Sequence, residues 1–196
     1  MRRALRFLGI CLILVGLGLG GTRIHQHWQS DREYRSTQQA LQKELRTSSA
    51  PRAGDALARL RIPRFGSGYT PVIVEGVSQE ALKKGPGHYP GTAMPGELGN
   101  FAVAGHRTGW GQPFHRLPEL KKGDAIEVEW QGRSYTYRVT RTKLVVPSDV
   151  GVVLPVPGRR GAEPDTARIT LTTCADRGRD GTYVHRLVVQ GELGGR

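Results

Sequence analysis

Hydrophobic and polar residues alternate in short stretches along most of the chain, from about residue 57 to the C-terminus. A period of two is typical of β-strands that bury one face. In "RITLTTC", for example, Ile169, Leu171 and Thr173 are expected on one face of a strand, and Thr170 and Thr172 on the other. Seven or eight such stretches with few helices predict an all-β domain, either a β-sandwich or a closed barrel.

Local signals predict how several of these stretches begin and end. "DAIEVEWQGRSYTYRVTRTKLVVP" predicts a hairpin of two strands around Gln131 and Gly132. "SQEALKKG" starts with Ser78, a good helix N-cap, and predicts one or two helical turns that end at Gly85. Pro63 indicates an edge strand or a bulge. "PSDVGVVLPVPGRRGAEPDT" has no regular period, and loops of that length are usually functional or disordered.

The N-terminus has a different pattern. Three arginines within residues 1–6 precede an uncharged run of 16 residues, 7–22. This run is shorter than the ~20 residues that span a bilayer upright, so a signal peptide and a retained anchor are both open. The absence of a small-x-small cleavage site after the run favours an anchor over residues 7–24, with a cytoplasmic tail before it. We therefore expect a single-pass plasma-membrane protein whose remaining chain lies on the outer side.

Residues 25–57 are polar and have a weak helical period at Tyr34, Leu41 and Leu45. The segment ends in a cluster of serine, alanine, proline and glycine, which is typical of linkers. We interpret it as a partly helical stalk that holds the domain off the membrane. The folded domain is then expected over residues 58–196.

The formal net charge of +12 is concentrated toward the N-terminus, because the first 60 residues carry as much of it as the remaining 136. Residues 1–60 hold 10 Lys and Arg against 4 Asp and Glu, and the rest hold 19 against 13. Half of the excess therefore lies beside the expected anchor, where anionic lipid or cell-wall polymer is the neighbour. The domain has no basic run with interleaved aromatics, so we expect no nucleic-acid partner.

The chain has two cysteines, Cys11 in the apolar run and Cys174 at the end of "RITLTTC". Because these two cannot meet, the exported domain carries one unpaired thiol in an oxidising compartment. A buried structural cysteine is the simpler interpretation of Cys174. Exposure to oxidants penalises such a thiol, however, and this favours a reactive one.

A thiol nucleophile needs a proton partner and a group that stabilises charge on the attacked carbonyl. His106 ends "NFAVAGH" as Cys174 ends "RITLTTC", and two strand ends can share one rim, so His106 is the expected partner. His88 lies in a turn and is expected to order its loop. Arg186 starts the final strand, and its planar guanidinium suits an oxyanion. A solvated surface arginine remains the alternative for Arg186.

Three blocks, "NFAVAGHRT", "TLTTC" and "HRLVVQGEL", resemble in order and spacing the signature blocks of the sortases, membrane-anchored cysteine transpeptidases of Gram-positive bacteria. "GPGHYPGTAMPGELGNFAVAGHRTGWGQPFHRL" and the later "PVP" resemble class E most closely. The resemblance covers roughly residues 58–193. It implies a closed eight-stranded sortase-type β-barrel with short helical turns, and catalytic roles for His106, Cys174 and Arg186.

The resemblance also implies a reaction. Cys174 would attack the Thr–Gly bond of a C-terminal sorting signal on an exported protein, with an LAxTG-like rather than an LPxTG sequence. An amine of a peptidoglycan precursor would resolve the thioacyl enzyme, and without an acceptor hydrolysis would be slow. No cofactor and no metal are expected. The residues chosen as peptide contacts are Tyr89, Val153, Leu154, Thr172 and Thr173.

Two points remain open at this stage. "ADRGRDGTYVHR" is unlike the shorter link found in the family, so Arg177 and Arg179 are alternatives to Arg186 for the oxyanion role. The protein is expected to attach substrates to the cell wall, but a pilin-polymerising enzyme with a lysine acceptor is an alternative. A non-catalytic, wall-binding β-domain on an anchor is another, and it would not need Cys174.

Overall fold

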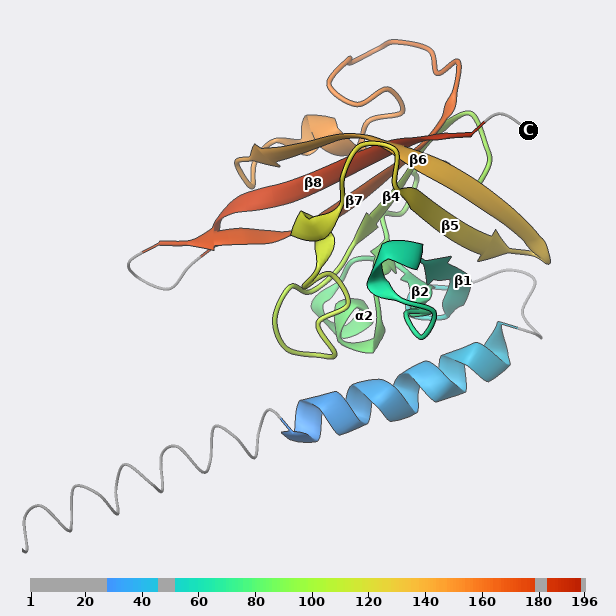
Figure 1. Ribbon diagram of the computed structural model, residues 1–196, viewed down its shortest axis with the longest axis vertical. Helices are drawn as coiled ribbons and strands as arrows, with labels where there is room; N and C mark the ends of the chain where they lie inside the picture. The colour runs from blue at the N-terminus through green and yellow to red at the C-terminus, as the bar shows by residue number, and fades with distance from the viewer. Residues whose placement is uncertain (1–27, 46–51, 179–182, 195–196) are drawn as a thin grey trace, which may run out of the picture.

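The computed structural model describes residues 28–45, 52–178 and 183–194. Within these residues the strands form a closed barrel with the neighbour order β1-β2-β3-β4-β7-β8-β6-β5 (Figure 1). The expectation of a closed barrel is therefore confirmed, and the β-sandwich is excluded. The strands are β1 (Ala56–Arg61), β2 (Val72–Glu75), β3 (Gly87–His88), β4 (Gly99–Ala104), β5 (Ala125–Trp130), β6 (Arg133–Val145), β7 (Ala167–Arg177) and β8 (Tyr183–Leu193).

Short helical turns connect the strands: η1 (Pro63–Phe65), α2 (Gln79–Lys84), η2 (Leu117–Glu119) and η3 (Val150–Val153). The helix predicted in "SQEALKKG" is confirmed, because the Ser78 hydroxyl accepts the Ala81 N–H at 3.1 Å and the helix ends at Gly85. The interpretation of Pro63 is wrong. β1 ends before it, and Pro63 opens η1, where a missing N–H costs nothing.

The predicted β5–β6 hairpin is confirmed. Its two turn residues, Gln131 and Gly132, have φ values of 48° and 73°. A two-residue turn with positive φ at both positions has the twist that matches the flanking strands. Arg133 and Trp130 face each other directly across this turn.

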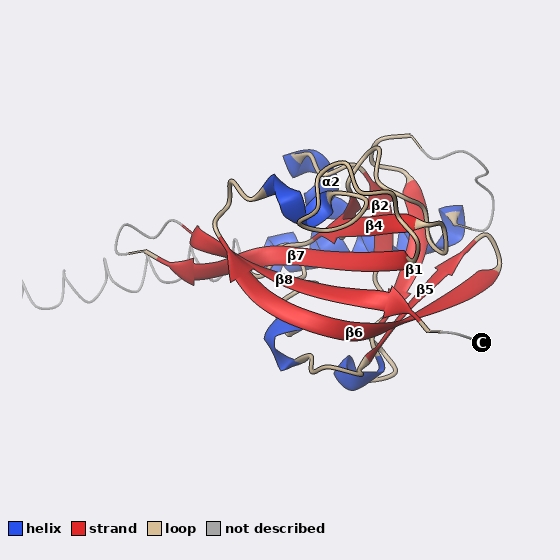
Figure 2. Ribbon diagram, turned by 90° about the horizontal axis from the view of Figure 1, so that it is seen from above, coloured by secondary structure: helices blue, strands red, loops and turns tan. Residues whose placement is uncertain are grey.

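β7 lies in the middle of the longest part of the sheet, parallel to β4 and antiparallel to β8 (Figure 2). Ile169 and Leu171 are fully buried in the main core, as the period of two in "RITLTTC" predicted. Thr170 and Thr172 point to the other face of the sheet, but they too are only 0% and 5% exposed. The outer face of β7 is therefore covered rather than open.

Residues 28–44 form a helix, here called the N-terminal helix, which lies along one side of the barrel (Figure 1). Leu41 is buried against Val72 and Ala81. The Gln38 side-chain amide donates to the Val72 carbonyl at 3.2 Å and accepts the Val72 N–H at 2.7 Å. The helical tendency of the predicted stalk is thus real, but this helix packs on the barrel instead of extending away from it.

The predicted cytoplasmic tail (1–6) and anchor (7–24) lie outside the described residues. In the part of the chain that the structure describes, no helix combines the length and the apolar character needed to cross a bilayer. The division into tail, anchor, stalk and domain stays a prediction.

Candidate active site

Cys174 and Arg186 occupy directly opposed positions on β7 and β8. Arg186 Nη1 donates a hydrogen bond to Cys174 Sγ at 3.3 Å, and both side chains are half-buried. A guanidinium has several donors in a fixed plane. It can therefore stabilise negative charge on the sulfur and also on an oxygen next to the sulfur.

His106 follows β4 by two residues, and the hydrogen bonds around it bring it to the same end of the barrel. The Gly105 N–H donates to the Thr172 carbonyl at 3.0 Å, and the Thr173 hydroxyl donates to the Gly105 carbonyl at 2.8 Å. These bonds extend the parallel β4–β7 register past the end of β4. His106 consequently lies level with Cys174. The expectation that Cys174 ends its strand is wrong, because β7 continues to Arg177 and keeps its pairing with β8 past the cysteine.

The surroundings of His106 suit proton transfer. Burial lowers the pKa of its imidazole below the usual value. Its Nε2 atom is buried and has no hydrogen-bond partner among the described residues. A ring nitrogen that no protein group occupies is available to exchange a proton with a bound substrate.

Arg107 contributes a second link between β7 and the segment that follows β4. Its Nη1 atom donates to the Cys174 carbonyl at 3.4 Å. This side chain therefore contacts the backbone of the cysteine, whereas Arg186 contacts the thiol. The sequence interpretation did not single out Arg107, although a basic residue directly after His106 was a usable signal.

The residues proposed from sequence as peptide contacts are placed differently from one another. Tyr89 is half-buried, and its hydroxyl lies 3.3 Å from Thr172 Oγ1. Tyr89 therefore contacts β7 two residues before Cys174. Thr173 is 3% exposed, and its hydroxyl is bound to Gly105. Thr173 therefore orders the backbone next to His106 and presents almost no surface to a peptide.

Asn100 ties the loop between β6 and β7 to the outer face of the barrel. Its Nδ2 atom donates to the carbonyls of Val152 and Leu154, each at 3.1 Å. Its Oδ1 atom accepts the Thr170 hydroxyl at 2.8 Å. Val153 lies between the two tethered carbonyls, and Val153 and Leu154 are half-buried. Asn100 had no sequence signal beyond its place at the start of "NFAVAGH".

His88 orders its loop, as expected from sequence. Its Nδ1 atom lies 2.7 Å from Glu75 Oε2, and its Nε2 atom lies 2.8 Å from Thr92 Oγ1. The ring stacks on Phe101 with centroids 5.1 Å apart. The Thr92 hydroxyl also donates to the Tyr89 carbonyl at 2.8 Å. This network fixes the backbone of Tyr89 through groups that are not exposed to substrate.

The alternative oxyanion roles of Arg177 and Arg179 stay predictions. Arg179 lies outside the described residues, and only the backbone of Arg177 is described, paired with Tyr183. Among the side chains that the structure describes, no three of His, Cys, Asp or Glu gather in a way that could hold a metal ion.

Comparisons with known proteins agree with this geometry. A family model described as "Sortase domain" matches residues 60–194. The sortase SrtE1 of Streptomyces coelicolor is 33% identical over 192 residues, which cover 94% of this chain and 53% of that protein. The chain therefore spans about half the length of this relative.

Solved structures give the same result. Sortase E of Streptomyces avermitilis has a TM-score of 0.64 and 40% identity, over 74% of this chain and 91% of that one. The sortase SrtF of Corynebacterium diphtheriae has a TM-score of 0.69 and 32% identity, over 76% and 89% of the two chains. The strand order, the opposed Cys174 and Arg186 and these matches lead to one conclusion: the chain belongs to the sortase family and resembles its class E members.

Proposed function

We propose that this protein is a cysteine transpeptidase that cuts a sorting signal between Thr and Gly and joins the new end to an amine. The observation that carries the proposal is the hydrogen bond from Arg186 to the Cys174 thiol, with His106 level with the cysteine just past the end of β4. The nucleophile thus comes from β7, the charge-stabilising donor from β8, and the proton carrier from the residues just after β4, and these three strands are neighbours in the barrel. Acyl transfer needs these three roles.

The acylation step assigns one role to each of these residues. The Cys174 sulfur, as thiolate, forms a bond to the carbonyl carbon of the threonine. The carbonyl electrons move onto oxygen, where the Arg186 guanidinium donates hydrogen bonds to the negative charge. When the carbonyl re-forms, the bond to the glycine nitrogen breaks. His106 in its protonated form gives its proton to the departing amine.

The second step releases the thioacyl enzyme. His106, now neutral, accepts a proton from an acceptor amine as that amine attacks the thioester carbonyl. Sulfur leaves as thiolate, and an amide bond replaces the thioester. Water in place of the amine gives slow hydrolysis. We expect a peptidoglycan precursor as the acceptor and the cell wall as the destination of the joined protein.

The substrate assignment rests on the class E resemblance. We expect a signal of the LAxTG type, with Tyr89 on one side of the peptide and Val153 and Leu154 on the other. Thr172, which is only 5% exposed, would act by holding the Tyr89 hydroxyl. Tyr89 and Thr172 meet next to the cysteine strand, and Asn100 holds the loop that carries Val153 and Leu154. Attachment to the outer side of the plasma membrane through residues 7–24 is part of the same proposal.

The test uses the full chain in detergent micelles with LAxTG and LPxTG peptides, with and without candidate amines. We expect a mass adduct on Cys174 when no amine is present, and a joined product when a suitable amine is added. The LAxTG peptide should react faster. The variant Cys174→Ala should form neither product. Peptide cleavage that survives Cys174→Ala contradicts the proposal.

The same experiment separates the alternatives. A pilin-polymerising enzyme would prefer a peptide with a lysine side chain as the amine over a peptidoglycan-like amine. A non-catalytic wall-binding domain would give no adduct with any peptide. Alkylation of the Cys174 thiol would then leave its function unchanged.

A further inference from the structure

The loop that follows His106 contains a rare backbone conformation. Four consecutive residues, Gly109, Trp110, Gly111 and Gln112, have φ values of 70°, 50°, 70° and 49°. They form one left-handed turn, closed by a hydrogen bond from the Gln112 N–H to the Gly109 carbonyl at 2.9 Å. Left-handed conformation costs about 1–2 kcal/mol for each non-glycine residue. Trp110 and Gln112 carry this cost, so contacts from elsewhere must hold the turn.

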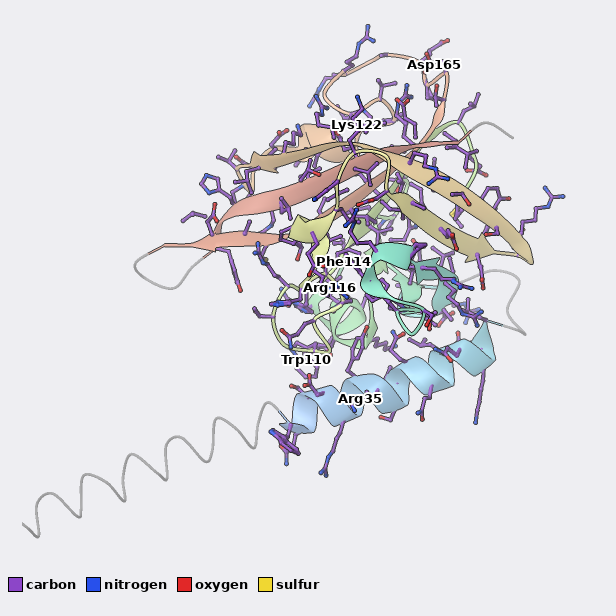
Figure 3. All side chains as sticks on the ribbon, in the orientation of Figure 1. Arg35, Trp110, Phe114, Arg116, Lys122 and Asp165 are labelled. Carbon is purple, nitrogen blue, oxygen red and sulfur yellow. The ribbon has the colours of Figure 1, made fainter. Side chains whose placement is uncertain are left out.

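Those contacts come from the N-terminal helix and α2. The Asp31 carboxylate accepts the Gly111 N–H at 3.3 Å. The Tyr34 ring is buried and lies so close to Gly111 that a Cβ atom there would come within 2.1 Å of it. From α2, Lys83 Nζ lies 5.3 Å from the centroid of the Trp110 ring. Figure 3 shows Trp110 at the end of the loop that faces the N-terminal helix.

The turn is connected to His106 by a short and well-fixed path. The Phe114 N–H donates to the His106 carbonyl at 3.0 Å, which closes the loop. The Phe114 side chain is fully buried and packs on Gly105. The Tyr69 hydroxyl donates to the Pro113 carbonyl at 2.7 Å. Only residues 107 and 108 separate the turn from His106 along the chain, so a shift of the turn reaches His106 through a short stretch of backbone.

The helix touches this turn at few points. A cavity of about 490 Å³ lies beside the contact, between the helix and the loop, and is lined by Tyr34, Gln38, Gly111, Gln112, His115 and Arg116 among others. Loss of the Tyr34 ring, which lines this cavity, would enlarge it. The left-handed turn would then lose its main packing partner.

We propose that Tyr34 and Asp31 of the N-terminal helix are positioning residues for catalysis: they hold the left-handed turn 109–112 and so fix His106 beside Cys174. The segment that leads from the expected membrane anchor would then be part of the catalytic machinery. This inference rests on the transpeptidase function proposed above, since it concerns the proton transfer by His106.

The test measures kcat and KM for one sorting peptide, together with Tm, on the full chain in detergent. Tyr34→Ala should lower kcat about tenfold or more with little change in KM, because misplacing a catalytic group slows chemistry rather than binding. Tyr34→Phe keeps the ring and should stay within about twofold of the wild type. Asp31→Ala removes no core side chain, and it should also lower kcat. Asp31→Asn keeps an oxygen that can accept the Gly111 N–H, so its kcat should be close to that of the wild type.

A matched control separates positioning from general stability. Leu41 lies on the same helix but packs on the cluster around Val72, away from the turn. Leu41→Ala should lower Tm at least as much as Tyr34→Ala and leave kcat within about twofold. If both variants lower kcat in proportion to Tm, or if Tyr34→Ala and Asp31→Ala leave kcat unchanged, the inference is overturned.

A second variant tests the contact from the other side. Gly111→Ala places a methyl group against the Tyr34 ring and should lower kcat. In the Tyr34→Ala background that clash is absent, so the further loss from Gly111→Ala should be clearly smaller. Fully additive losses contradict the contact. Cys174→Ala in the same assay shows whether the proposed function itself holds, because turnover by that variant would overturn the function and not merely the positioning.

Discussion

Arg186 Nη1 lies 3.3 Å from Cys174 Sγ, and the two residues are direct partners across the β7–β8 ladder. Sheet pairing therefore places the two side chains opposite each other on neighbouring strands. The eleven residues between them in sequence return the chain to the opposed position on the next strand. A donor held in this way needs no reorganisation when charge develops on a thioester oxygen.

This geometry predicts how Arg186 responds to substitution. Arg186→Ala should lower turnover of a sorting peptide by about 10²–10³, the usual effect of removing one oxyanion donor. Arg186→Lys should be nearly as slow, because lysine keeps the charge but loses the planar pair of donors. The measurement is kcat/KM for each variant at two ionic strengths.

Arg159 provides a control because it is an exposed arginine on the β6–β7 loop. Arg159→Ala should give a small effect that salt screens, whereas the loss at Arg186 should persist in high salt. Full activity in Arg186→Lys would mean that Arg186 contributes only its positive charge and not the planar pair of donors. A selective loss in Arg177→Ala or Arg179→Ala would move the oxyanion role to that residue.

His106 should be needed for chemistry more than for folding. His106→Ala should lower turnover by about 10²–10⁴, the range expected for a general acid or base, while Tm changes little. We expect only a small change in Tm, because the His106 Nε2 atom has no hydrogen-bond partner to lose among the described residues. His115 is the control, since its Nδ1 atom only approaches the Arg107 carbonyl at 3.3 Å. A larger loss of turnover in His115→Ala than in His106→Ala would show that His106 is not the proton carrier.

The lowered pKa of His106 makes a separate prediction about stability. In the unfolded chain a histidine has a pKa of about 6.5. Above that pH the His106 imidazole is neutral in both the folded and the unfolded state, so protonation of His106 costs the folded protein no stability. As the pH falls through this value, the unfolded chain binds the proton first, and stability is lost until the pH passes the lower folded pKa. The wild type should therefore lose more Tm than His106→Gln on acidification below about pH 6.5. Equal losses in the two proteins would contradict the prediction.

The His88 network should matter for stability and, through Tyr89, for substrate affinity. His88→Ala leaves the Glu75 carboxylate and the Thr92 hydroxyl without their partner and opens space next to Phe101. A buried polar group that loses its hydrogen bond costs about 1–3 kcal/mol. Thermal unfolding should show a lower Tm, and peptide kinetics a higher KM. An unchanged Tm would mean that the loop keeps its structure without this network.

Much of this site could be predicted from sequence, because strands carry local signals. The alternation in "RITLTTC" predicted which side chains of β7 enter the core. The pairing of His106 with Cys174 was predicted from two expected strand ends, although β7 in fact continues past Cys174 to Arg177. The opposed position of Arg186 followed from a hairpin-like return of the chain. A pattern with a period of two is local information, and sheet pairing converts it directly into position.

Other features depend on contacts between distant segments, for which a single sequence has no local signal. The N-terminal helix was interpreted as a stalk because its apolar face is narrow, with only Tyr34, Leu41 and Leu45 in period. Its docking depends on the Gln38 amide, which replaces a strand partner for Val72. A glutamine in a polar segment does not indicate such a role. Pro63 was misread for a related reason, since the end of β1 at Arg61 is set by its pairing with β5.

The tether at Asn100 predicts an effect on peptide affinity. Asn100→Ala removes both donors to the Val152 and Leu154 carbonyls and frees the loop that carries Val153. If this loop forms one wall of the peptide site, KM for an LAxTG peptide should rise about five- to tenfold with kcat nearly unchanged, because only uniform binding is lost.

Thr170→Val is the matched control for that tether. It removes the hydroxyl that Asn100 Oδ1 accepts but leaves both bonds from Nδ2 to the loop intact. Its KM should therefore rise much less than that of Asn100→Ala, although Thr170→Val disturbs the same buried cluster. Steady-state kinetics on both variants, with Tm measured in parallel, tests this difference. A fall in kcat at constant KM in Asn100→Ala would place the loop in the chemical step and contradict a role in peptide binding.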